Sequence, residues 1–219
     1  MSAVTSAQVN ELRQKTGAGM MDCKKALTES AGDLEKAVDW LRKKGLSNAA
    51  KKAGRVASEG LVGSYLHMGG KVGVLVEVNS ETDFVAGNES FKEFIKDLCL
   101  HVCANKPQFL APEDVPADIL SRERDIARDM AKQSGKPEQF HDKIIEGKIS
   151  RYNDDNCLLE QSYVKDPTKK VKEVLQELVG KLGENIKIRR FVRFEMGEGL
   201  EKKNEDFAAE VASKMGTTN

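Results

Sequence analysis

Two carboxylates and a phenylalanine follow the most regular strand pattern in this chain. In KVGVLVEV at 71–78 every second residue is valine, which predicts a half-buried strand, and NSETDFVAGN at 79–88 comes directly after it. Glu81 and Asp83 could form an acid/base pair, but carboxylates at the end of a strand more often cap a turn or a helix. No other catalytic group is indicated beside them. From its position alone, Phe84 is expected to fold back into the core.

Three potential metal ligands lie close together further along the chain. Cys99, His101 and Cys103 fall in one predicted helix, where Cys99 and Cys103 share a face and His101 points about 200° away. The other two cysteines, Cys23 and Cys157, are distant in sequence, and the four do not resemble a secreted disulfide framework. We therefore expect structural cysteines and no metal site.

Sequence signatures of enzymes and nucleotide-binding proteins are missing. The chain has neither a P-loop nor a GxGxxG motif after a strand, so it gives no support for binding a nucleotide by itself. No nucleophile has a recognisable local signature, and the three histidines, His67, His101 and His141, lie in unrelated contexts. An enzyme is therefore the weaker class of hypothesis, and no cofactor is expected.

Composition narrows the class of partner. The 35 basic and 35 acidic residues cancel, so general affinity for nucleic acid is not the default and a protein or small-molecule partner is favoured. The sequence contains no apolar stretch of 18 residues and no signal region at its start. We expect a cytoplasmic protein without membrane contact, or one in an organelle after removal of a transit peptide.

Residues 1–54 predict a compact unit of three helices. Ser6 is expected to cap the first helix, TGAG at 16–19 separates it from the second, Asp33 caps the third and Gly45 ends it. Met20 and Met21 point about 100° apart, so a unit this small can rarely bury both. At least one exposed methionine is therefore expected, either as part of a partner surface or as a frayed helix start without function.

Residues 55–198 predict an α+β core. Two strands flank a Gly69-Gly70 turn, ESFKEFIKDLCLHVCANKPQF at 89–109 forms a helix ended by Pro107, and Asp166-Pro167 begins another helix. A third strand is expected in ENIKIRRFVRFEMGEG at 184–199, and completes a three-stranded antiparallel sheet. Its alternation puts the following residues on one side: Ile186, Ile188, Val192, Phe194 and Met196.

Residues 118–152 predict a protruding antiparallel pair of helices. Their apolar seam is expected to contain Ile119, Ile126, Met130, Phe140, Ile144, Ile145 and Ile149. Basic residues are interleaved with acidic ones along both helices, so a solvated face is favoured over a nucleic-acid grip. Residues 199–219 are expected to form a C-terminal helical module around Phe207 and Val211.

Six segments, in order, resemble the translation elongation factor Ts family of bacteria and organelles. They are ELRQKTGAGMMDCKKALTE at 11–29, AKKAGRVASEG at 50–60, LVEVNSETDFVAGN at 75–88, HVCANKPQF at 101–109, MAKQSGKPEQ with KIIEGKI at 130–149, and RFEMGEGLEKKNEDFAAEV at 193–211. The likeness extends over essentially the whole chain. It implies a guanine-nucleotide exchange factor for the GTPase elongation factor Tu, with a ubiquitin-associated-like N-terminal domain and no chemistry of its own.

The resemblance also assigns contact residues. Thr82, Asp83, Phe84 and Val85 match the family's TDFV motif, which presses into the GTPase near its bound magnesium and loosens GDP. Phe84 is on this basis an exposed wedge and not a core residue. Arg13, Met20 and Met21 fall on the family's N-terminal contact surface, and His101 matches a core histidine that is carried as a further interface candidate.

The chain departs from longer family members, whose core is duplicated, because it carries a single set of core elements. Short members are thought to restore the second surface by pairing, and a homodimer is expected here. Two alternatives stay open. One is a nucleic-acid or ribosome-associated protein that uses the helical pair and a basic sheet face with Lys187, Arg189 and Arg193. The other is an adaptor that works through the N-terminal unit alone.

Overall fold

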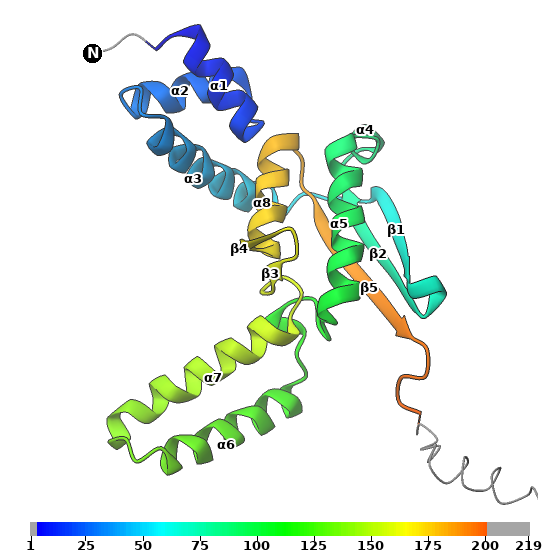
Figure 1. The fold of residues 1–219 in the computed structure, drawn as a ribbon. Coiled ribbons are helices and arrows are strands. Elements are labelled where there is room, and N and C mark those ends of the chain that lie inside the picture. Colours follow the sequence, from blue (N-terminus) through cyan, green and yellow to red (C-terminus); the bar gives the residue numbers. More distant parts are fainter. Residues whose placement is uncertain (1–3, 201–219) are drawn as a thin grey trace, which may run out of the picture.

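The computed structural model describes residues 4–200 and shows three regions (Figure 1). An N-terminal group of three helices contains α1 (Ser6–Thr16), α2 (Met20–Glu29) and α3 (Leu34–Lys52). A mixed core follows, and a pair of long helices projects away from it. The expected α+β class is confirmed. The helix expected around Phe207 and Val211 lies outside the described residues.

The N-terminal helices enclose a small hydrophobic core of their own. Leu12, Cys23 and Leu27 are fully buried there. Thr5 caps α1 in a reciprocal arrangement with Gln8, so the prediction of Ser6 as the cap was wrong by one residue. The prediction that Gly45 ends the third helix was also wrong, because α3 continues through it to Lys52.

The main sheet is antiparallel, with strand order β1-β2-β5. It contains β1 (Glu59–His67), β2 (Val72–Ser80) and β5 (Lys187–Glu195), and the turn η1 (Met68–Gly70) joins the first two. The four alternating valines of β2 are buried beneath α5 (Glu89–Asn105), as the pattern predicted. Gly63 of β1 is required at this contact because a side chain there would clash with Ile95 of α5.

A bulge in β5 reverses its alternation. Val78 pairs with Ile188 and Glu77 with Arg190, so Arg189 is an extra residue in the strand. Ile188 is buried before the bulge, but Phe194 is 70% exposed after it and Phe191 packs against the core instead. The prediction that one face carries Ile186 to Met196 was therefore wrong beyond the bulge.

A second, smaller sheet precedes the last helix. It pairs β3 (Ser162–Tyr163) with β4 (Asp166–Lys170), and α8 (Val171–Leu182) begins after it. The prediction of a helix beginning at Asp166-Pro167 was wrong, because Pro167 is within β4 and Asp166 accepts hydrogen bonds from Thr168 in a local turn. The helix starts where Glu173 accepts a hydrogen bond from the Lys170 N–H at 3.0 Å.

The projecting pair consists of α6 (Ala117–Gln133) and α7 (His141–Asn156), with η2 (Pro112–Asp114) before it and η3 (Glu138–Phe140) at its tip. Its seam differs from the expected one: Ala127, Ala131 and Ile149 are buried, whereas Ile126, Met130 and Phe140 are about half exposed. The buried side chains of α6 are therefore small alanines, and the larger Ile126 and Met130 face solvent.

Candidate functional site

The segment after β2 forms a single helical turn, α4 (Asp83–Ala86), that presents Phe84 outward. Thr82 caps this turn, because its hydroxyl accepts a hydrogen bond from the Val85 N–H at 3.4 Å. Val85 and Ala86 are 4% and 6% exposed and belong to the core, while Phe84 is 83% exposed. The first expectation for Phe84, a core position, is wrong, and the family resemblance gave the exposed position.

The burial of Val85 changes its expected role. We expected this residue on the partner surface together with its three neighbours, but its side chain packs inside the core. It can anchor the turn and cannot offer a free side chain to a partner. Asp83 and Thr82 are exposed beside Phe84, so three of the four motif residues reach the surface.

Hydrogen bonds from one distant segment, the loop after α8, hold this turn. The Glu184 carboxylate, just after α8, accepts from the Thr82 N–H at 3.0 Å and from its hydroxyl at 2.7 Å. The Glu81 carboxylate accepts from the Asn185 N–H at 2.6 Å, which gives Glu81 a structural role in place of acid/base chemistry. Sequence reasoning missed Glu184 and Asn185, since they lie more than 100 residues away and only Gly183, a helix-ending signal, marks their position.

The N-terminal candidates gather around the loop between α1 and α2. Arg13 is exposed near the end of α1, and Met20 and Met21, at the start of α2, are 53% and 75% exposed. The expectation of at least one exposed methionine is confirmed. Two neighbouring exposed methionines are flexible apolar side chains, which are common where proteins contact one another.

Lys181 of α8 connects the two groups of candidates. Its ammonium donates to the Ser90 hydroxyl, at the start of α5, at 2.8 Å. A Cβ on Gly17, in the loop between α1 and α2, would lie 3.1 Å from the Lys181 Cε. The start of α2, with Met20, and the turn that carries Phe84 are therefore at the same end of the molecule, on either side of α8 (Figure 1).

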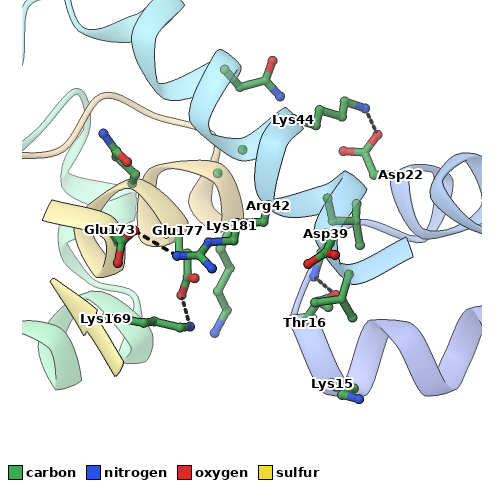
Figure 2. A pocket seen from close by; sticks show the side chains of 17 residues that line it. Lys15, Thr16, Asp22, Asp39, Arg42, Lys44, Lys169, Glu173, Glu177 and Lys181 are labelled. Atoms are coloured by element: carbon green, nitrogen blue, oxygen red, sulfur yellow. Dashed lines mark hydrogen bonds and ion pairs between the residues drawn. The ribbon is translucent and has the colours of Figure 1, made fainter. Parts of the chain in front are cut away.

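A cleft of about 280 Å³ lies at the junction of the N-terminal helices with α8, and Figure 2 shows its charged lining. Arg42 pairs with Glu173 at 2.9 Å, and Lys169 pairs with Glu177 at 2.8 Å. Lys44 pairs with Asp22. Because these paired charges neutralise one another, we interpret the cleft as the interface between the N-terminal helices and α8 and not as a binding site for an anion.

His101 is not on a surface. Its ring is fully buried; Nε2–H donates to the Gln161 side-chain oxygen at 2.9 Å, and Nδ1 accepts from the Val164 N–H at 3.2 Å. Burial lowers its pKa below the ordinary value of 6.5, against a smaller opposing effect of Gln161. The expectation of a direct interface contact by this side chain is therefore corrected, because it joins α5 to the segment before β4.

The potential metal ligands among residues 4–200 are dispersed. In that range no three His, Cys, Asp or Glu side chains are grouped to hold an ion. All four cysteines are free and buried, and burial raises the pKa of Cys99 and of Cys157 to about 11. Across the same residues, none of the helices has the length and apolar character needed to cross a bilayer.

Together, these elements define an α+β protein that exposes apolar side chains on α2 and α4. The sequence model of the elongation factor TS family matches residues 48–198. Elongation factor Ts of Geobacter metallireducens is 61% identical over 214 residues, and that of Desulfitobacterium hafniense is 55% identical over 215. Both alignments cover 98% of this chain and 99% of the relative. The chain belongs to the elongation factor Ts family, a family of translation elongation factors.

Proposed function

We propose that this chain promotes release of GDP from elongation factor Tu, and that Phe84 is the wedge that disturbs the magnesium site of that GTPase. Family membership supports the exchange activity. The observation that supports a wedge role for Phe84 is that its side chain is 83% exposed on a turn whose next two residues are buried. Burying a phenylalanine is worth about 1.5–3 kcal/mol, so a fixed turn that leaves one in water favours a pocket on a partner.

The chemistry of release then belongs to the partner. A bound magnesium is often the largest local charge in a nucleotide site, and displacing it weakens the hold on GDP. Asp83, exposed beside Phe84, brings a negative charge to the same contact. By linkage, a factor that weakens nucleotide binding is itself displaced when nucleotide binds, so GTP ends the cycle. The factor acts in the cytoplasm, where translation takes place in bacteria such as those of the relatives.

Arg13, Met20 and Met21 form the second contact surface in this proposal. They lie at the same end as Phe84, and Lys181 packs between the two regions. One GTPase domain could then touch both surfaces at once. The adaptor alternative, in which only the N-terminal helices bind, leaves the exposed Phe84 without a role.

Release of a fluorescent GDP analogue from elongation factor Tu tests the wedge. Phe84→Ala is expected to lower the accelerated rate at least about 30-fold, the equivalent of about 2 kcal/mol for a buried aromatic anchor. Phe140→Ala, at the tip of the helical pair, is a matched control because it removes another exposed ring. Equal losses in the two variants, or no acceleration by the unmodified chain, would overturn the proposal.

We also propose that two copies pair through the open face of the main sheet. No other described segment covers this face in Figure 1, while α5 covers the opposite one. Register places five exposed apolar side chains there: Val62, Leu66, Leu75, Val192 and Phe194. A second copy is the occupant because the chain carries a single, unduplicated set of α+β core elements, and a self-complementary patch suits a twofold interface.

Light scattering over a dilution series measures this pairing. Leu75→Lys, in the middle of the face, is expected to give a monomer at concentrations where the unmodified chain is a dimer. Met130→Lys, on the helical pair, is the control and should leave the mass unchanged. A monomeric mass for the unmodified chain at every concentration would reject the dimer.

The basic sheet face expected under the nucleic-acid alternative is not present as a continuous surface among residues 4–200. The bulge separates Lys187 from Arg193, and Arg189 pairs with Glu77 at 2.7 Å. The Arg193 side chain is only 8% exposed and pairs with Glu195 and Glu198. The two arginine charges are thus neutralised within the chain, which favours the protein partner.

A further inference from the structure

We propose that Glu184 is a positioning residue that sets the orientation of Phe84 by holding Thr82 at two points. This inference rests on the proposed wedge role of Phe84. Its basis is the paired contact of one carboxylate with both the N–H and the hydroxyl of Thr82, at 3.0 and 2.7 Å.

The two contacts together fix the side-chain rotamer of Thr82 as well as its distance from Glu184. The Thr82 hydroxyl donates to Glu184, which leaves its oxygen free to accept the Val85 N–H at 3.4 Å. Thr82 is the residue from which α4 begins, and Phe84 is the second residue of that turn. The direction of the phenylalanine ring therefore depends on the side-chain rotamer of Thr82, and Glu184 selects that rotamer.

Glu184 is itself held in place on both sides. Gly183 ends α8 in the left-handed region, at φ 80, which turns the chain toward Thr82. Asn185 is 3% exposed, and its N–H donates to the Glu81 carboxylate at 2.6 Å. Residues 184 and 185 thus bond to residues 82 and 81, and this double link aligns the end of β2 with the start of β5.

The same group reaches the connector between the N-terminal helices and the core. The Asn185 side-chain amide donates to the Arg55 carbonyl at 2.7 Å, and the Arg55 guanidinium lies 3.5 Å from Glu81. The connector, the loop after α8 and the turn that carries Phe84 therefore meet at one place. This arrangement holds Phe84 in a set position relative to the N-terminal helices, of which α2 carries Met20 and Met21.

A double-mutant cycle on GDP release tests the assignment. Glu184→Ala is expected to lower the saturating release rate at least fivefold and to change the half-saturating concentration less than twofold, since Phe84 and the N-terminal surface both remain. In a Phe84→Ala background the same substitution should change the rate less than twofold. In Glu184→Gln the amide oxygen can accept from the Thr82 N–H and the amide NH2 can donate to the Thr82 hydroxyl oxygen, so this variant keeps two links and should recover most of the rate.

A second variant tests the same link if Glu184→Ala fails to fold. A second readout tests the positioning of Phe84 even if the proposed wedge function is wrong. Thr82→Val removes the hydroxyl link at nearly constant volume and should reproduce the effect of Glu184→Ala. A fluorinated phenylalanine placed at position 84 should give one narrow ¹⁹F resonance in the unmodified chain and a broadened or shifted one in Glu184→Ala. This readout needs no partner, so it separates failure of the positioning from failure of the exchange function.

Three results would overturn the positioning role. One is an equal loss of rate from Glu184→Ala with and without Phe84, which would indicate a general structural effect. Another is an unchanged ¹⁹F resonance. The third is a fully active Glu184→Ala variant in an assay where Phe84→Ala is defective.

Discussion

A Cβ placed on Gly180 of α8 would lie 3.4 Å from the Cα of Gly45 in α3, so these helices cross backbone against backbone. The N-terminal helices are joined to the core at this crossing, and the Arg42–Glu173 ion pair lies on the same interface. Gly45 therefore does not end α3; it lies in the helix interior at the place where α8 passes closest.

Enlarging Gly180 should force α3 away from α8. Gly180→Leu is expected to lower the free energy of unfolding by about 1–3 kcal/mol, the usual cost of overpacking a close contact. Gly45→Ala is the matched comparison: a Cβ there meets no neighbouring atom within 4 Å, so higher helix propensity should raise stability by up to about 1 kcal/mol. Urea unfolding of both variants measures the difference, and changes of the same sign would contradict the crossing.

Acid should weaken the fold through His101. Burial depresses its pKa in the folded state, so below pH 6.5 the unfolded chain binds a proton that the folded chain does not. The stability contributed by neutral His101 is present above pH 6.5 and is lost as the pH falls toward the depressed pKa. Urea midpoints at pH 7.5 and 5.0 should differ less in His101→Gln than in the unmodified chain. An unchanged difference would show that other groups cause the acid sensitivity, and His141→Gln is the control.

The hydroxyl of Tyr163 should stabilise the small sheet against α5. It donates to the Asp97 carboxylate at 3.1 Å, and Lys165 holds the other oxygen at 2.7 Å. Asp97 is only 7% exposed, so Tyr163→Phe leaves a buried charge with one partner fewer. The expected loss is about 1.5–3 kcal/mol in urea unfolding, as for other hydrogen bonds to charged groups. The Tyr65 hydroxyl lies 3.0 Å from His67 Nδ1 near the surface, so Tyr65→Phe should lower the free energy of unfolding much less.

Local patterns predicted most of the elements. The alternating valines of β2 and the cap at Asp33 depend on neighbours in sequence, and both are present. The bulge at Arg189 could not be predicted in this way, because it depends on how β5 aligns with Glu77, more than a hundred residues earlier. One unpaired residue was enough to exchange the faces of Phe191 and Phe194.

The candidate site shows the same division. The residues of the site near Phe84 could be predicted because the TDFV motif is a continuous stretch of sequence. The exposure of Phe84, however, was predicted from the family resemblance and not from periodicity. Glu184 and Lys181 were missed since each acts on a segment about 90 to 100 positions away. The exposed residues on α6 differ from those expected because a seam of alanines is as compatible with the pattern as one of isoleucine and methionine.

The two faces of β5 should respond differently to charge. Phe194→Asp places a carboxylate on the open face and is expected to keep the fold while preventing self-association. Phe191→Asp would put the same charge against the core and should unfold the chain, because burying an unpaired charge costs several kcal/mol. Circular dichroism and light scattering on both variants measure this contrast. A folded Phe191→Asp together with an unfolded Phe194→Asp would place the bulge elsewhere.

Pairing between copies should not depend on disulfides. Cys23, Cys99 and Cys157 are fully buried and Cys103 is 8% exposed, and the raised pKa of Cys157, about 11, keeps its thiol protonated at neutral pH. Since the thiolate is the reactive form, a thiol reagent should modify the folded chain far more slowly than the same chain in urea. At pH 8.5 a small free thiol with a pKa of about 8.5 is about half ionised, whereas a thiol with a pKa of about 11 is still almost wholly protonated, so Cys157 should remain far slower to react than the free thiol at that pH. A covalent dimer on a non-reducing gel that disappears in Cys157→Ser would show instead that this cysteine reaches the surface and links two copies.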